Sequence, residues 1–213
     1  MVKIKLAKPK LKKVLRPGLL KSSGIPLPLS QVNPRNIKGP VWWKEQRRKV
    51  IAANNNHCWA CGVHQQDARY KQYLEAHEVF TVNYAKRIST FKEVVALCHC
   101  CHNVVHVKRL VYLAAQGKED EKKLRTIVQH GVDVLQASRL ALPYQLEYAW
   151  MVVFGGCDAQ EAIDKLKASG LFNSNMRIAP HDWHKWRMEF EGQLYKPKFN
   201  SEFELARHYY DAD

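Results

Sequence analysis

The first forty residues contain no aspartate and no glutamate, although ten of them are Lys or Arg. Acidic residues are scarce in the whole chain as well, since 20 Asp and Glu stand against 34 Lys and Arg and give a formal net charge of +14. A charge this positive favours a polyanionic partner such as nucleic acid. Because residues 1–40 mix Lys with Pro, Gly and Ser without a helical period, we expect a basic, flexible arm that contacts phosphates or keeps the protein in solution.

No apolar run approaches the span of a bilayer, and the basic start is not followed by the apolar region of a signal peptide. We therefore expect a cytoplasmic protein without a membrane partner. The six cysteines are then expected to be reduced or metal-bound rather than paired in disulfides. The chain shows no internal repeat, no phosphate-binding glycine loop and no nucleophile elbow, so none of these motifs indicates its function.

Four of the cysteines form two Cys-x-x-Cys pairs on either side of a segment of about forty residues. The pairs are Cys58 with Cys61 and Cys98 with Cys101. Two such pairs can turn four thiolates toward one ion, which is the ligand set of a tetrahedral structural zinc. Cys100 and Cys157 are left over, and we interpret both as small buried apolar residues.

Three histidines near the second pair form a further candidate set. His102 and His106 are spaced i, i+4, so on a helix they share one face, and His77 lies in the segment between the two cysteine pairs. The three imidazoles are sufficient for a second metal site. They could instead be core or zinc-site residues without a second ion.

The segments around these residues predict a strand pair and a helix. Residues 70–82 and 91–97 are rich in Tyr, Phe and Val and predict strands, whereas 101–110 predicts a helix with both histidines toward the strands. A further helix is expected from Trp42 to Ile51, with its tryptophans closing the core over the zinc. Residues 113–213 predict a mostly helical region, with helix starts at Asp158 and Ser201 and with Trp183 and Trp186 in buried packing.

The segment Leu74–Val79 and the Cys-His-x-x-x-His ending at His106 resemble the HNH endonuclease superfamily in its zinc-knuckle, ββα-metal form. Small HNH-like proteins of phages and bacteria are similar over about residues 20–112. The resemblance implies an α+β protein with a basic arm (1–40), an HNH-like zinc domain (41–112) and a helical C-terminal region (113–213). It also implies metal-dependent hydrolysis of phosphodiester bonds in DNA.

Mapped by motif, the resemblance gives His77, His102 and His106 as ligands of a second divalent ion (Mg²⁺, Mn²⁺, Ni²⁺ or Zn²⁺). One departure from the family pattern concerns the base, because Glu78 stands where the family normally has a histidine. A glutamate is a weaker base unless burial raises its pKa. Either Glu78 serves as the base or cleavage is lost, and in an alternative register His77 is the base and Glu75 completes the ligand set.

The expected partner is double-stranded DNA, bound with little sequence preference, and a host or phage protein is the alternative. Candidate phosphate contacts come from the arm, the tryptophan-bearing helix and the end of the histidine helix. They are Lys10, Lys12, Lys13, Arg16, Arg35, Arg47, Arg48, Lys108 and Arg109.

Overall fold

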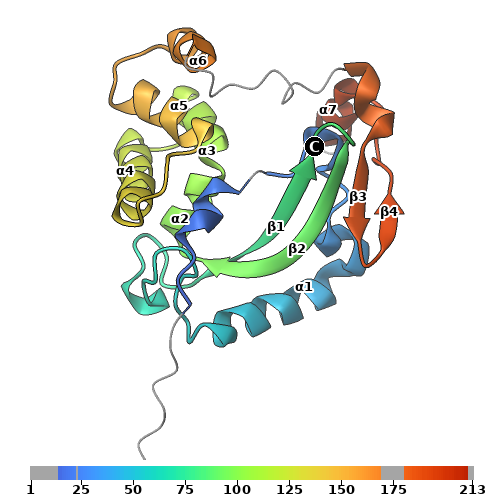
Figure 1. Cartoon of the computed structure of the whole chain (residues 1–213), viewed down its shortest axis with the longest axis horizontal. Helices are drawn as coiled ribbons and strands as arrows, with labels where there is room; N and C mark the ends of the chain where they lie inside the picture. The colour runs from blue at the N-terminus through green and yellow to red at the C-terminus, as the bar shows by residue number, and fades with distance from the viewer. Residues whose placement is uncertain (1–13, 23, 169–179, 211–213) are drawn as a thin grey trace, which may run out of the picture.

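The computed structural model describes residues 14–22, 24–168 and 180–210, which form an α+β fold (Figure 1). The α-helices are α1 (Pro34–Ala53), α2 (His99–Val105), α3 (Val107–Ala115), α4 (Glu121–Ala137), α5 (Tyr144–Val153), α6 (Ala159–Ala168) and α7 (Glu202–Tyr210). The strands are β1 (Glu75–Asn83), β2 (Ile88–Leu97), β3 (Arg187–Phe190) and β4 (Gln193–Tyr195). Short 3-10 helices cover Pro17–Lys21, Leu27–Leu29, Gln65–Asp67 and Pro180–Lys185.

The strands form one mixed sheet in the order β1-β2-β3-β4. β1 and β2 are an antiparallel hairpin with Glu75 opposite Leu97 and Asn83 opposite Ile88. The side chain of Asn83 closes the turn by accepting the Lys86 N–H at 2.9 Å. β1 is an edge strand, so among the described residues one of its two sides pairs with no other strand.

Helices cover the hairpin from two directions (Figure 1). α1 runs along one side of the hairpin. Helices α2 to α5 gather on the other side, at the end where β1 begins and β2 ends. α1 begins earlier than expected because Asn33 caps it, accepting the Asn36 N–H at 2.9 Å, and Pro34 occupies its first position. Gly39, with φ of 83°, breaks the helical geometry before Pro40.

The buried side chains form two clusters. The larger cluster joins the cysteine pairs, the C-terminal half of β2 and helices α2 to α5, and it includes Leu20, Leu97 and Ile127. The smaller cluster lies at the other end of the hairpin and contains Leu29, Val32, Phe80, Trp186, Met188 and Phe190. The expectation that the tryptophans of α1 close the core over the zinc is wrong for Trp42, which packs in the smaller cluster with its ring 6.0 Å from that of Phe190.

Residues 14–40 differ from the expected flexible arm. Leu20 and Leu29 are completely buried, one in each cluster. The backbone N–H of Val14 donates to Asn54 Oδ1 at 2.6 Å, and Arg16 pairs with Glu93 of β2 at 2.9 Å. Apolar residues in a basic segment thus fold it onto the domain. Residues 1–13 lie outside the described part of the chain.

The region after residue 113 is helical through α4, α5 and α6, as expected, but the expectation missed β3 and β4. β3 pairs in parallel with β2, from Ile88 opposite Arg187 to Thr90 opposite Glu189. The capping prediction at Asp158 is confirmed, since its side chain accepts the Glu161 N–H at 2.8 Å. Trp183 and Trp186 are buried as expected. Among the described residues, no helix is both long and apolar enough to cross a membrane.

Candidate functional site

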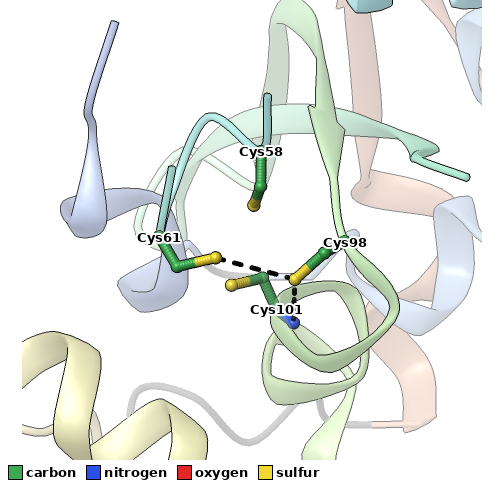
Figure 2. Close-up of side chains that lie close together, drawn as sticks. All are labelled: Cys58, Cys61, Cys98 and Cys101. Atoms are coloured by element: carbon green, nitrogen blue, oxygen red, sulfur yellow. Dashed lines mark hydrogen bonds between the residues drawn. The ribbon is translucent and has the colours of Figure 1, made fainter. Parts of the chain in front are cut away.

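The four cysteines of the two pairs converge on one point (Figure 2). All four sulfurs lie within 4.8 Å of one another, and Cys61 Sγ and Cys98 Sγ are 3.7 Å apart. Four sulfurs bound to one zinc at about 2.3 Å are separated by about 3.8 Å. The donor set and its spacing therefore fit a structural zinc, as the sequence predicted.

Local backbone structure explains why the sulfurs meet. Gly62 has φ of 74° and its N–H donates to the Cys58 carbonyl at 2.9 Å, which turns the first pair back on itself. Cys98 follows directly after β2 and caps α2, where its sulfur accepts the Cys101 N–H at 3.5 Å. The Trp59 N–H donates to the Ala96 carbonyl at 2.9 Å and fixes the first pair to β2.

One further contact of the cysteine cluster comes from a residue that the sequence did not assign to it. His130 of α4 places Nε2 3.2 Å from Cys101 Sγ, so α4 contacts the cluster directly. Cys100 is buried outside the ligand set, and burial raises the pKa of its thiol to about 11. Its interpretation as a small buried residue is consistent with this position.

The three histidines also come together. Their ring nitrogens lie within 4.8 Å of one another, with ring centroids 4.9 to 5.3 Å apart. His77 comes from β1, His102 from α2, and His106 from the break between α2 and α3. Burial, reinforced by the other imidazoles, lowers the pKa of His77 well below its ordinary value and that of His106 to about 4. Neutral imidazoles are the form that binds metal, so this cluster fits a divalent ion.

Glu75 is the residue that sequence reasoning undervalued. Its Oε2 lies 2.7 Å from His102 Nδ1, while its Oε1 is 2.6 Å from Lys71 Nζ and 3.3 Å from His99 Nδ1. Burial acts to raise the pKa of Glu75, but His102 and Lys71 outweigh it and hold this pKa well below its ordinary value. A carboxylate on Nδ1 leaves Nε2 of His102 free for a metal, which is a common arrangement around metal-binding histidines. The alternation of the strand, with Glu75 two residues before His77, was the signal available in the sequence.

A pocket of about 310 Å³ opens over the histidine cluster at the edge of β1. It is lined by the three histidines, by Glu78 and by two cationic side chains, Arg35 at the start of α1 and Arg109 of α3. The loop before α1 and the ring of Trp43 complete its walls. Glu78 is the acidic residue among those lining it, so the pocket suits an anionic ligand.

Glu78 follows His77 in β1 and lines the same pocket at the edge of the strand. Its Oε1 accepts the backbone N–H of Arg35 at 3.1 Å, and it is not part of the histidine cluster. Burial raises the pKa of Glu78, and the contact with Arg35 offsets this only in part. This is the direction that a glutamate needs to act as a base near neutral pH.

The predicted phosphate contacts separate into groups. Arg35 and Arg109 line the histidine pocket, and Lys108 lines the cavity next to it. Arg47 and Arg48 are exposed on later turns of α1, where Arg47 lies over the ring of Tyr73 at 5.7 Å. Arg16 is engaged by Glu93, as described above. The remaining three, Lys10, Lys12 and Lys13, fall outside the described residues.

Comparisons with known proteins add no family to this description. No family model, curated protein or solved structure matches the chain.

Proposed function

We propose that the protein is a metal-dependent endonuclease of the HNH type, with DNA as its substrate. The observation that carries the proposal is the convergence of His77, His102 and His106 in one pocket with two arginines and a half-buried glutamate. Three imidazoles beside cationic side chains suit a phosphodiester. The hairpin followed by a helix, with a four-cysteine cluster beside them, supports the resemblance seen in the sequence.

In this proposal each residue of the pocket has its own role in hydrolysis. When bound by the three histidines, a divalent ion supplies positive charge against the phosphate to be cleaved. Arg35 and Arg109 hold the phosphate oxygens, and Glu75 keeps His102 oriented. Glu78 accepts a proton from a water molecule as the water oxygen attacks phosphorus. The bond from phosphorus to the leaving oxygen breaks, and that oxygen takes a proton from solvent.

The four-cysteine cluster has a structural role in this proposal. It joins the loop of residues 58–61 to the junction of β2 and α2, and thereby helps to fix α2, which carries His102, beside the hairpin that carries His77. All four sulfurs face one another (Figure 2). We expect one zinc in each chain.

Cleavage of a supercoiled plasmid tests the proposal. Zinc-loaded protein is assayed with Mg²⁺, Mn²⁺, Ni²⁺ or added Zn²⁺, and metal analysis accompanies each variant. His77→Ala and His102→Ala should abolish nicking while the zinc content stays at one per chain. His184→Ala is the matched control, because His184 is exposed and lies outside the pocket. Nicking by both pocket variants at the rate of the control would refute the proposed centre.

The role of Glu78 separates the enzyme from an inactive binding protein. If Glu78 is the base, Glu78→Gln should lower the cleavage rate by about 10²-fold or more and leave DNA affinity unchanged. The alternative is an HNH-like protein that binds DNA without cleaving it. One observation favours it: the Glu78 carboxylate already accepts a hydrogen bond from the Arg35 backbone N–H. In that case the wild type binds DNA without nicking it, and Glu78→His creates activity by restoring imidazole.

A further inference from the structure

The histidine pocket continues into a second cavity of about 630 Å³. The two share the loop of residues 24–30, His106 and Arg109 as walls. The second cavity, which we call the distal groove, extends from there to the turn after β1 and to the start of α5. Besides Ser30 and His106, which it shares with the histidine pocket, its polar and aromatic lining residues are Tyr84, Lys108, Arg109, Tyr144 and Gln145.

Charge in the distal groove has one sign. Lys108 and Arg109 are both exposed on α3, and among the described residues no aspartate or glutamate lines this groove. Together with Arg35 in the histidine pocket, they place three cations along one path. Such a path can follow several successive phosphates.

Aromatic rings accompany the cations. The ammonium of Lys108 lies 4.9 Å from the centroid of the Tyr144 ring and donates to the Tyr144 hydroxyl at 3.1 Å. Tyr84 is held by an edge contact with Trp186, with their ring centroids 5.8 Å apart. Rings fixed beside cations suit nucleic-acid bases, since every base has a face that can stack on them.

Gln145 adds a group that fits the edge of a base. The residue is 9% exposed and lines the distal groove. Its amide offers both donors and an acceptor, so a base that enters the groove can form hydrogen bonds with it.

We propose that the distal groove binds an unpaired strand of DNA next to the bond that lies at the histidines. In duplex DNA the bases are stacked and paired inside, so the rings and the amide of the groove would contact no base face. An unpaired strand supplies phosphates to the cations and bases to Tyr144 and Gln145 at once. His77 is only 8% exposed, and the flexible single strand reaches a recessed site more easily than a rigid duplex does. The substrate class is therefore single-stranded DNA rather than the duplex expected from the sequence; the choice of DNA rests on the proposed function.

Fluorescence anisotropy with zinc-loaded full-length protein tests this inference. The probes are a labelled oligothymidine of about 12 nucleotides, within the usual site size, and its DNA duplex with oligodeoxyadenosine. The second divalent ion is left out, so binding is measured without cleavage. The wild type should bind the single strand at least about tenfold more tightly than the duplex.

Variants then locate the binding to the groove. Tyr144→Ala should weaken single-strand binding about 5- to 150-fold, the effect of losing one stacked base, and should leave duplex binding unchanged. Tyr144→Phe keeps the ring and should bind as the wild type does. Tyr112→Ala is the control, because Tyr112 is exposed on α3 and does not line the groove. If Tyr144→Ala does not fold, the exposed Lys108→Ala replaces it, with weaker single-strand binding and a salt dependence reduced by about one charge.

Equal or tighter binding of the duplex by the wild type would overturn the inference, as would single-strand binding that is unchanged in both Tyr144→Ala and Lys108→Ala. These outcomes are distinct from failure of the proposed function. A protein that never nicks DNA but shows the preference that depends on Tyr144 would support the groove and refute the enzyme. Efficient cleavage without that preference would support the enzyme and refute the groove.

Discussion

Replacing Glu75 by glutamine should weaken the second metal site without changing the zinc site. The carboxylate lies 2.7 Å from Nδ1 of His102 and is held in place by Lys71, so it fixes which nitrogen of His102 faces the cluster. Glutamine keeps a hydrogen-bond acceptor of the same size but removes the charge. Loss of such an outer partner costs about 10- to 100-fold in metal affinity, or about 1.4 to 2.7 kcal/mol.

Calorimetric titration of Mn²⁺ or Ni²⁺ into zinc-loaded protein measures this effect. Glu189→Gln is a matched control, because Glu189 is also a half-buried strand glutamate but accepts a hydrogen bond from Thr90 instead of contacting a histidine. The zinc content of both variants should stay at one per chain. Equal affinity of Glu75→Gln and the wild type for the second ion would refute the orienting role of this carboxylate.

Three further predictions concern the fold. Cys98→Ser should lose the zinc and unfold the region around α2, which circular dichroism and metal analysis would detect; retention of both would contradict a structural zinc. Trp186→Ala should lower the free energy of unfolding by about 3 to 5 kcal/mol in urea titrations, because Trp186 is 2% exposed in the smaller cluster. Arg87 and Lys185 hold the pKa of Asp182 at about 2, so their stabilising contribution is present above the unfolded pKa of about 3.9 and is lost as the pH falls toward 2. Arg87→Ala should flatten that acid dependence of unfolding, and an unchanged profile would exclude the pair as its source.

The cysteine and histidine pairs of the two clusters could be predicted from the sequence because the spacing within each pair is local. Two residues between Cys58 and Cys61, and three between His102 and His106, are enough to place each pair on a turn or a helix face. Each pair needed only its own short segment. The convergence of all four sulfurs then followed from the hairpin that separates them.

Other features depend on contacts that spacing cannot encode. Strand alternation places Glu75 on the same face as His77, but its contact with His102 depends on β1 packing beside α2. β3 has four residues and pairs with a strand far from it in the chain, so no turn signal announces it. Residues 14–40 also depend on distant contacts. Their positive charge suggested a flexible arm, but the burial of Leu20 and Leu29 holds the segment against the domain.

The parallel pairing of β2 with β3 has a consequence for the order of folding. The hairpin, the cysteine cluster and α2 are complete once residue 105 has been synthesised, whereas the partner of Ile88 is Arg187. Pairings between such distant residues form late, because a long loop must close before they contribute. Until then β2 presents open backbone groups beside the apolar ring of Phe91, which makes the nascent chain prone to intermolecular strand pairing. The C-terminal strands therefore act as a cover for an edge that the rest of the fold creates.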